Sequence, residues 1–319
     1  MKFGTIPGVG KPVSRLALGT MIVTVKEIER SFALLDAATE SGYNALDTAH
    51  GYNSGDSERA IGRWLEARGN REKIVIMTKC CHPNCDRTRV TPFDIAADLH
   101  DSLARLKTSY VDLLFLHRDN LALPVGPIVE ALNEQVRAGR VRAFGASNWT
   151  HQRMQEANDY ARSRGLAPFV ASSPQYSLAV AQEPPWAGCI SARGPAFPGE
   201  EEWHARTRTP LFAWSSLARG LFHGTTTREN AAQVLGPAVV KTYCFEENFR
   251  RLDRAQELAR EKGVSVAQIA LAWVLHRPLD IFPLTGAATR EECLQNVAAL
   301  DIVLTRQESE WLDLQRDAR

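Results

Sequence analysis

Four side chains that can donate, accept or stabilise a proton lie at or just beyond short apolar runs in this chain. Asp47 ends the run 45–47, and Tyr52 lies on the turn that follows it. Lys79 and His117 each end a later apolar run. A tyrosine hydroxyl, with a reference pKa of about 10, is a poor acid at neutral pH unless a nearby ammonium stabilises the phenolate. A carboxylate can hold that ammonium in place, so these residue types suit proton transfer.

Each of the four residues has an ordinary structural interpretation when it is taken alone. A lysine at the end of a strand is usually solvated, a histidine after an apolar strand is often a hydrogen-bonded core residue, and a tyrosine can anchor a loop. One such residue would therefore be weak support for a function. All four fall at corresponding positions of one repeating pattern, however, and in a parallel barrel the ends of all strands open at one face. The set as a whole favours a reactive site.

The rest of the chain alternates strand-like and helix-like segments. Nearly uninterrupted apolar runs are typical of strands covered on both faces, and apolar residues three and four positions apart predict the covering helices. Eight strands answered by helices predict a closed (β/α)8 TIM barrel, an α/β fold, as a single domain over residues 1–319 with long loops at its C-terminal face. The predicted strands are Ser14–Gly19, a run ending at Asp47, Ile74–Lys79, Val111–His117, Val141–Ser147, Phe169–Gln175, Leu211–Ser215 and Ile281–Leu284. The predicted helices are Glu27–Ser41, Ser57–Arg68, Pro92–Lys107, Ile128–Ala138, Gln152–Ser163, Glu246–Lys262, Val266–Arg277 and one after Thr289, and residues 1–12 are expected to form a small hairpin.

Composition excludes several classes of protein. The formal net charge is +1 and there is no Lys/Arg-rich run, which argues against a nucleic-acid partner. Charged residues interrupt every apolar run, so no membrane partner is expected. The first residues lack the profile of a signal peptide, and we expect a cytoplasmic enzyme. Six cysteines in 319 residues do not indicate a disulfide scaffold.

An open dinucleotide-binding sheet is the main alternative architecture. It requires Gly-x-Gly-x-x-Gly between the first strand and helix, where the pyrophosphate approaches the backbone. This chain has Leu-Ala-Leu-Gly-Thr-Met at 16–21 and no such fingerprint. A dinucleotide must therefore be held in another way.

The stretch from Asp47 to Glu58 resembles the aldo-keto reductases. It reads Asp-Thr-Ala, then a tyrosine five residues after the aspartate, then Gly-x-Ser-Glu. The position after the tyrosine is usually glycine in that family, and Asn53 stands there in this chain. The resemblance covers nearly the whole chain and implies an NAD(P)H-dependent enzyme that reduces the carbonyl of a small molecule to an alcohol.

The resemblance also implies roles for Asp47, Tyr52, Lys79 and His117, which match the catalytic tetrad of that family. Tyr52 would supply the proton, Lys79 would stabilise its phenolate, and Asp47 would pair with Lys79. His117 would donate a hydrogen bond to the carbonyl oxygen. The hydride would come from the nicotinamide.

A cofactor site follows from the same resemblance. Ser147, Asn148 and Gln175 correspond to the residues that hold the nicotinamide carboxamide, and their amides and hydroxyls supply suitable donors and acceptors. Trp214 occupies the aromatic stacking position, although a core tryptophan is its structural alternative. The full implied set is Gly19, Thr20, Met21, Asp47, Ser147, Asn148, Gln175, Trp214, Ser215, Leu217, Gly220, Gly286, Thr289, Arg290, Glu292, Gln295 and Asn296.

The choice between the two nicotinamide cofactors depends on the segment 286–296. Glu292 stands where a phosphate-binding arginine is common in the family, and it could accept a hydrogen bond from a free 2′-hydroxyl. Thr289 and Glu292 also have the spacing of a capping box, and Arg290 could reach a phosphate at the helix start. The resemblance favours NADP(H), with NAD(H) as the alternative.

Side chains expected to face the substrate follow predicted strands or lie in long loops. They are His50, Arg118, Asp119, Trp149 and Trp186, the last in the long segment 182–209. Charged groups beside indole rings suit a hydroxylated substrate, because a ring face can stack while hydroxyls form hydrogen bonds. A sugar-like aldehyde or ketone is therefore predicted, with steroid or xenobiotic carbonyls as alternatives.

The cluster Cys80, Cys81, His82 and Cys85 could suggest a metal. Its spacing does not match a paired Cys-x-x-Cys site and no second pair is present, so we predict a thiol-bearing loop and no metal.

A second kind of function remains open from the sequence. A redox-sensing regulatory subunit, like the channel-associated members of the same family, would bind the cofactor without significant turnover. The complete tetrad favours the enzyme.

Overall fold

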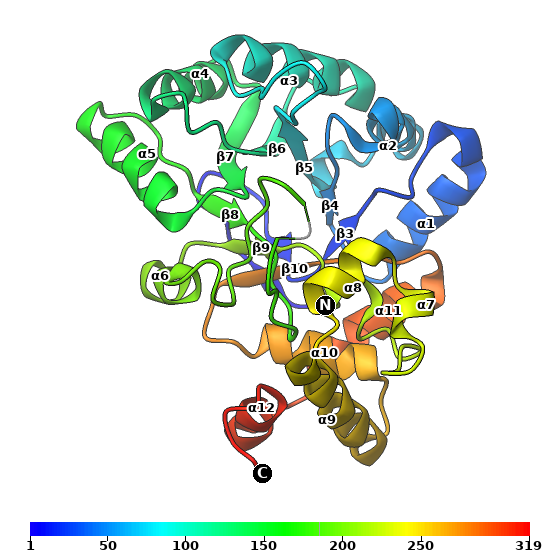
Figure 1. Ribbon diagram of the computed structural model, residues 1–319. Coiled ribbons are helices and arrows are strands. Elements are labelled where there is room, and N and C mark those ends of the chain that lie inside the picture. The colour runs from blue at the N-terminus through cyan, green and yellow to red at the C-terminus, as the bar shows by residue number, and fades with distance from the viewer. Residues whose placement is uncertain (185) are drawn as a thin grey trace. The chain divides into compact units, whose positions relative to one another are not determined.

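The computed structural model describes residues 1–184 and 186–319, and its parallel strands close into an eight-stranded barrel (Figure 1). The predicted α/β barrel is therefore confirmed. The strand order is β10-β3-β4-β5-β6-β7-β8-β9. The strands are β3 (Ala17–Gly19), β4 (Ala45–Asp47), β5 (Val75–Cys80), β6 (Val111–Leu116), β7 (Val141–Ser147), β8 (Ala171–Ser173), β9 (Leu211–Ala213) and β10 (Ile281–Thr285).

The helices observed agree with the predicted ones within a few residues at their ends, and short additional ones lie in the second half of the chain. The α-helices are α1 (Ile28–Glu40), α2 (Asp56–Arg68), α3 (Pro92–Leu106), α4 (Val125–Arg137), α5 (His151–Ser163), α6 (Glu200–Thr207), α7 (Ala231–Val234), α8 (Pro237–Tyr243), α9 (Glu246–Lys262), α10 (Val266–Leu275), α11 (Arg290–Ala298) and α12 (Arg306–Leu312). The 3-10 turns are η1 (Val25–Glu27), η2 (Tyr52–Gly55), η3 (Arg71–Lys73), η4 (Ala218–Gly220) and η5 (Ala299–Asp301).

A small hairpin precedes the barrel. Its strands β1 (Phe3–Gly4) and β2 (Val13–Ser14) are antiparallel, with Phe3 opposite Ser14. The hairpin thus extends slightly beyond the predicted residues 1–12. Because Ser14 belongs to it, the first barrel strand starts at Ala17 and is shorter than predicted.

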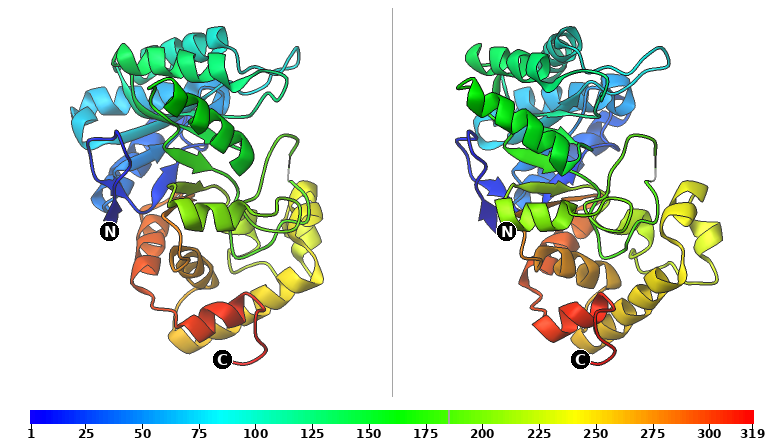
Figure 2. Two further views of the ribbon diagram at one scale, coloured as in Figure 1. Left: turned by 90° about the vertical axis from the view of Figure 1, so that its left-hand side faces the viewer. Right: turned by 60° about the vertical axis from the view of Figure 1, so that its left-hand side comes forward.

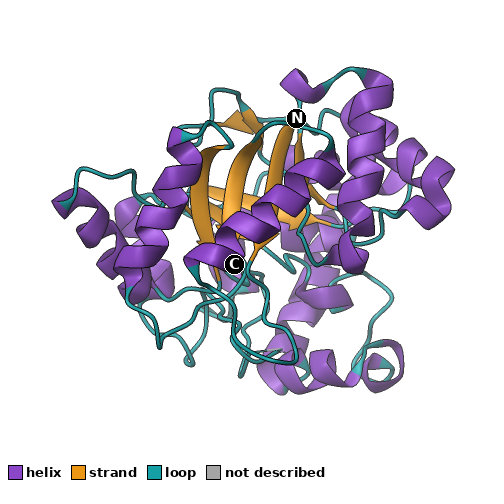
Figure 3. Ribbon diagram, turned by 90° about the horizontal axis from the view of Figure 1, so that it is seen from above, coloured by secondary structure: helices purple, strands orange, loops and turns teal. Residues whose placement is uncertain are grey.

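The chain divides into two compact units: Met1–Ser173 with Gly286–Cys293, and Pro174–Thr285 with Leu294–Arg319. In the first unit, helices α1 to α5 succeed one another along the outer side of β3 to β8 (Figures 1 and 2). Seen from above, the barrel strands have helices outside them (Figure 3). The prediction of a single domain stays a prediction.

The packing of α2 on α3 places the turn that carries Tyr52. A Cβ atom at Gly62 would lie only 2.2 Å from the carbonyl oxygen of Arg105, so glycine lets these two helices approach closely. The start of α3 is stabilised by a capping box, in which Thr91 and Asp94 each accept a hydrogen bond from the backbone of the other. Since α2 begins directly after η2, this packing anchors one end of the Tyr52 turn.

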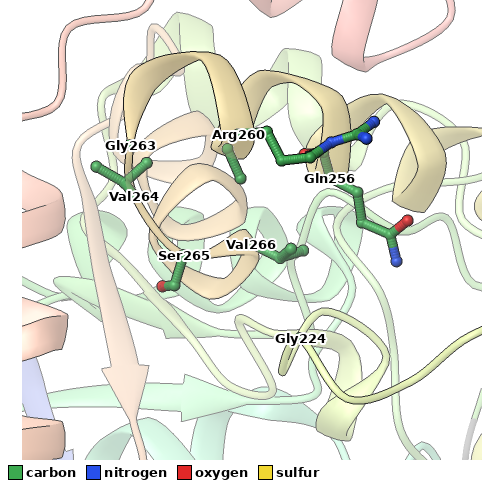
Figure 4. A pocket seen from close by; sticks show the side chains of 8 residues that line it. Gly224, Gln256, Arg260, Gly263, Val264, Ser265 and Val266 are labelled. Carbon is green, nitrogen blue, oxygen red and sulfur yellow. Dashed lines mark hydrogen bonds between the residues drawn. The ribbon is translucent and has the colours of Figure 1, made fainter.

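The second unit has its own apolar core around α9 and α10. Trp273, Tyr176, Tyr243 and Phe222 are fully buried there, and the rings of Tyr176 and Trp273 are stacked with centroids 6.0 Å apart. A hollow of about 560 Å³ opens between the end of α9, the start of α10 and the loop at Gly224 (Figure 4). None of the predicted site residues lines that hollow.

Candidate active site

Lys79 is the central member of the predicted tetrad. Its Nζ atom donates to Asp47 Oδ1 at 2.7 Å and to Tyr52 Oη at 3.0 Å. Strand pairing explains the first contact, because Asp47 lies opposite Met77 on the neighbouring strand. Lys79 follows Met77 by two residues and therefore points to the same face of the sheet. The structure thus brings Asp47, Lys79 and Tyr52 together as the sequence predicted.

Burial and charge set the protonation of these three groups. Burial raises the pKa of Asp47 above its usual value, against the opposing charge of Lys79. Burial alone would lower the pKa of Lys79, but Asp47 and Tyr52 outweigh it and raise that pKa. Burial also raises the pKa of Tyr52, and the Lys79 ammonium opposes this effect. Tyr52 is therefore a protonated phenol at neutral pH, and it accepts the Lys79 hydrogen bond while keeping its own O–H to donate.

Tyr52 lies on a turn with unusual backbone angles. The next two residues, Asn53 and Ser54, have φ values of 49° and 55°, in the left-handed region. Asparagine is among the few residues that adopt this region readily. The Asn53 amide also donates to the carbonyl oxygens of Met21 and Val23 at 2.6 Å and 3.2 Å. The family's glycine and this asparagine both satisfy the same backbone requirement.

A hollow lies between this turn and the loop after β3. Its volume is about 450 Å³, and its lining includes Asn53 and Ser54 from the turn and Met21 and Ile22 from the loop. The side chains of Met21 and Ile22 are 65% and 50% exposed. An apolar edge is thus available next to the turn of Tyr52.

His117 stands directly after β6, and its backbone N–H donates to Cys80 at the end of β5. Its ring meets that of Tyr52 edge-on, with centroids 6.0 Å apart. Its Nδ1 atom is buried and has no hydrogen-bond partner among the described residues. Burial is the main reason that the pKa of His117 lies well below its usual value, and the charges of Lys79, Arg118 and His82 lower it further. His117 is therefore neutral at neutral pH.

His82 is a neighbour of His117 that sequence reasoning did not assign to the site. Its ring packs edge-on against His117 with centroids 4.8 Å apart, and its Nδ1 is 2.9 Å from the carbonyl oxygen of Pro83. A signal existed in the sequence, since His82 follows Lys79 by three residues, just after the end of β5. The predicted thiol-bearing loop thus presents an imidazole to His117, whereas Cys80 and Cys81 are buried.

Ser147 and Asn148 lie together at the end of β7. The Ser147 hydroxyl donates to the carbonyl oxygen of Ser173 at 2.8 Å. The Asn148 amide donates to Ser147 Oγ at 3.0 Å and to the carbonyl oxygen of His117 at 3.2 Å, from a backbone with φ of 62°. The hydroxyl of Ser173 is buried and has no partner among the described residues. Sequence reasoning did not single out Ser173, which adds a hydroxyl to the predicted pair.

Gln175 belongs to the second unit and is fully buried. Its Oε1 accepts from the Ser191 hydroxyl at 2.6 Å, and its Nε2 donates to Ser177 Oγ at 3.0 Å. Ser191 comes from the segment 186–199, which precedes α6, and forms a parallel bridge with Gln175. Two serines therefore determine which way the amide of Gln175 faces.

Trp214 forms an aromatic contact within the second unit. Its ring centroid lies 5.8 Å from that of Trp186, and the Arg219 guanidinium lies 4.3 Å from the Trp186 ring centroid. Trp186 is 44% exposed, whereas the Nε1 atom of Trp214 is buried without a hydrogen-bond partner among the described residues. Ser215, Leu217 and Gly220 continue the chain from Trp214 into the turn η4, and the Ser215 φ is 52°.

The cofactor-binding segment predicted from Gly286 onwards begins α11 with a capped turn. Thr289 Oγ1 accepts from the backbone N–H of Glu292 at 3.2 Å, and the Glu292 carboxylate accepts from the backbone N–H of Ala288 at 2.7 Å. Arg290 is 65% exposed, and its Nε lies 3.6 Å from Glu40 Oε2. The carbonyl oxygen of Gln295 accepts a hydrogen bond from Gln268, and Asn296 follows it on α11. Glu292 is thus folded back on its own helix start.

Other predicted residues occupy varied surroundings. Thr20 follows Gly19, is buried, and donates to the carbonyl oxygen of Asp47 at 2.9 Å. His50 lies 3.3 Å from Asp101 Oδ2 on α3. Trp149 is only 1% exposed and donates to the carbonyl oxygen of Arg118 at 3.1 Å. Trp149 thus holds the loop of Arg118, and a direct contact of His50 or Trp149 with substrate stays a prediction.

The described residues were also searched for membrane-spanning helices and for groups of side chains that could hold a metal ion. Within residues 1–184 and 186–319, no helix is long and apolar enough to cross a membrane. The same residues contain no group of three His, Cys, Asp or Glu side chains placed to hold a metal ion.

Comparison with known proteins identifies the family. The chain belongs to the Aldo/keto reductase family, whose model matches residues 15–197 and 201–314. It is therefore an NAD(P)H-dependent oxidoreductase of that class, as predicted.

It is 30% identical to the uncharacterized oxidoreductase YrpG of Bacillus subtilis, over 96% of this chain and 93% of that one. It is 28% identical to the aryl-alcohol dehydrogenase (NADP(+)) of Phanerodontia chrysosporium, over 96% and 83%. A crystal structure of an aldo-keto reductase from Klebsiella pneumoniae in complex with NADPH is similar over 100% of this chain and 97% of that one, with 26% identity and a TM-score of 0.72.

Proposed function

We propose that this protein reduces an aldehyde or ketone to an alcohol, with Tyr52 as the proton donor. The observation that carries the proposal is the position of the Lys79 ammonium, 2.7 Å from Asp47 and 3.0 Å from Tyr52. The partly buried phenol keeps its proton until a substrate oxygen accepts it, and the ammonium then stabilises the phenolate. A bound nicotinamide cofactor supplies the hydride.

His117 orients the substrate oxygen in this proposal. Because its imidazole is neutral, it has one N–H to donate, and a donor aimed at the carbonyl oxygen polarises the C=O bond. The neutral form also avoids a second full positive charge beside Lys79. Asn148 donates to the His117 backbone and so helps to hold the ring in place.

The residues of both units fit a nicotinamide cofactor when each unit is taken by itself. The buried hydroxyl of Ser173 and the buried Nε1 of Trp214 have no partner among the described residues, as expected of groups that wait for a ligand. In the first unit we assign Ser147 and Asn148 to the carboxamide of the cofactor. In the second unit, taken by itself, we assign Gln175 and Trp214 to cofactor binding.

NADPH is the cofactor we favour. A 2′-phosphate is repelled by a free carboxylate, but the Glu292 carboxylate is engaged with the backbone of Ala288. The exposed Arg290 is then available to the phosphate. The names of the aryl-alcohol dehydrogenase (NADP(+)) and of the NADPH complex agree with this choice.

For the substrate we propose a carbonyl compound with a ring or chain that can stack on an indole. In the first unit, the exposed apolar pair Met21 and Ile22 supports an apolar face on the substrate, and in the second unit, taken by itself, the half-exposed Trp186 offers an indole. Sugar-like aldehydes and aryl aldehydes both have such a face, and the rates at which the protein reduces members of each class show which class it prefers.

The test is NADPH and NADH oxidation with a panel of aldehydes, ketones and oxidised sugars, for wild type and Tyr52→Phe. We expect the variant to bind NADPH normally and to lose about 10²-fold or more in turnover, as for a lost general acid. Tyr160→Phe is the matched control, because Tyr160 lies on α5 and its hydroxyl bonds to Glu130. Turnover of Tyr52→Phe near the wild-type rate would overturn the assignment. NADPH binding without turnover of any carbonyl by wild type would instead support a redox-sensing regulatory subunit.

A further inference from the structure

Arg118 stands between the catalytic candidate His117 and the acidic residue Asp119. It is half-buried, and its Nη1 donates to the carbonyl oxygen of His117 at 2.8 Å. No carboxylate forms an ion pair with it within the described residues. A guanidinium has five N–H donors, and among the described residues a single acceptor, the carbonyl oxygen of His117, is found for them.

Three other partly buried arginines of the first unit have acidic partners. Arg89 lies 2.6 Å from Asp98, Arg105 lies 3.3 Å from Glu58, and Arg153 lies 3.3 Å from Asp119. This is the usual arrangement, because a charge removed from water without a partner is costly. Unlike these three arginines, Arg118 has no acidic partner among the described residues.

The carboxylates near Arg118 are already engaged elsewhere. Asp119, the next residue, accepts from Arg153 on α5 and from the backbone N–H of Asn120. Asp47 is paired with Lys79. The positive charge of Arg118 is therefore not neutralised by the acidic groups closest to it in the sequence and the site.

The charge of Arg118 also acts on the groups proposed to do the chemistry. After burial and Lys79, it is the next cause that lowers the pKa of His117. It also lowers the pKa of Tyr52, although burial outweighs it and the net shift is upward. The backbone of Arg118 is held by the Trp149 indole N–H at 3.1 Å, so the guanidinium starts from a fixed point.

We propose that Arg118 binds a carboxylate of the substrate, so that the preferred substrates are aldehydes or ketones carrying a carboxylate away from the reacting carbonyl. The proposal rests on the carbonyl reductase function proposed above. A planar guanidinium matches a carboxylate with two parallel hydrogen bonds, which gives orientation as well as affinity. The carboxylate would take the place of the missing counter-ion and align the carbonyl with Tyr52 and His117.

The test compares two substrates that differ by one charge, 4-carboxybenzaldehyde and its methyl ester, with NADPH as the reductant. In wild type we expect kcat/KM for the acid to exceed that for the ester by about 10-fold or more, mostly through KM, as for a charge-assisted hydrogen bond. In Arg118→Gln the ratio should fall to about 1, and Arg118→Lys should retain part of it. Arg30→Gln, which removes an exposed arginine of α1, is the control and should keep the wild-type ratio.

The outcomes separate this proposal from the proposed function. Equal kcat/KM for acid and ester in wild type would overturn it, whatever the folding of the variants. An acid preference that survives in folded Arg118→Gln would overturn the assignment to Arg118. If wild type reduces neither these compounds nor any carbonyl of the panel, the carbonyl reductase function fails, and calorimetric titration of both compounds into the NADPH complex still decides the inference. Tighter binding of the acid, lost in Arg118→Gln, would support it, and equal binding would overturn it.

Discussion

The side-chain amide of Asn53 donates to the carbonyl oxygen of Met21 at 2.6 Å, and this bond joins the Tyr52 turn to the loop after β3. A second bond to Val23 and a third to Ser57 Oγ complete the connection. The family's glycine could adopt the same backbone angles but could make none of these bonds. Asn53 therefore adds a link between a turn proposed for catalysis and a loop proposed for cofactor binding.

Replacing Asn53 separates its backbone contribution from its side-chain contribution. Asn53→Gly keeps the left-handed conformation and removes the bonds, which should cost about 1 kcal/mol of unfolding free energy. Asn53→Ala removes the bonds and also strains the backbone, so we expect a loss of about 2–3 kcal/mol. Urea unfolding of both variants measures the difference. Equal stability of the two variants would contradict the argument from backbone angles.

The lowered pKa of His117 predicts that the free energy of unfolding depends on pH. In the folded protein this pKa is well below the unfolded value of about 6.5. Above pH 6.5 both states are neutral and His117 adds no slope. Below pH 6.5 the unfolded state binds a proton that the folded state rejects, so the unfolding free energy should fall by up to about 1.4 kcal/mol per pH unit. Urea unfolding between pH 5 and 8 should show a shallower slope for His117→Asn than for wild type, and parallel curves would exclude a buried neutral His117.

The choice of cofactor can be tested at Arg290. If Glu292 stays folded back on the helix start, Arg290→Ala should weaken NADPH binding by about 1–3 kcal/mol and leave NADH binding nearly unchanged. Tryptophan fluorescence quenching measures both affinities. Glu40→Gln is the control, because it removes the acidic neighbour of Arg290 and should not weaken NADPH binding. Tighter binding of NADH than of NADPH by wild type would instead assign Glu292 to the 2′-hydroxyl.

A substitution at Ser191 tests whether the orientation of the Gln175 amide matters for cofactor binding. Removing its hydroxyl in Ser191→Ala frees Gln175 Oε1 and lets the amide turn over, so NADPH affinity should fall by about 5- to 10-fold, as for one lost buried hydrogen bond. The fragment 2′,5′-ADP lacks the nicotinamide and should bind wild type and variant equally. Ser191→Thr, which keeps the hydroxyl, should restore NADPH affinity. A parallel loss of affinity for the fragment would indicate a general disturbance of the loop.

Much of this protein could be predicted from local signals in the sequence. The apolar runs ending at Asp47, Lys79 and His117 and the helical spacing between them predict parallel strands with their ends at one face. These signals act over short distances, because a strand or helix needs only its own periodicity and caps to be recognised. The barrel follows from them, whereas the closeness of Asp47, Lys79 and Tyr52 was implied by the resemblance to the aldo-keto reductases.

The choice of partner for each polar side chain was decided by the tertiary structure. Nothing in the sequence indicates that Asp119 pairs with Arg153, and so leaves its neighbour Arg118 without an acidic partner in the described part of the chain. The same holds for Ser191, which is brought by a long loop to the amide of Gln175, and for Trp149, which is buried beneath the loop of Arg118. The physical reason is that strand ends are specified by periodic burial along the chain, whereas hydrogen bonds and ion pairs depend on which side chains packing brings within about 3 Å of one another.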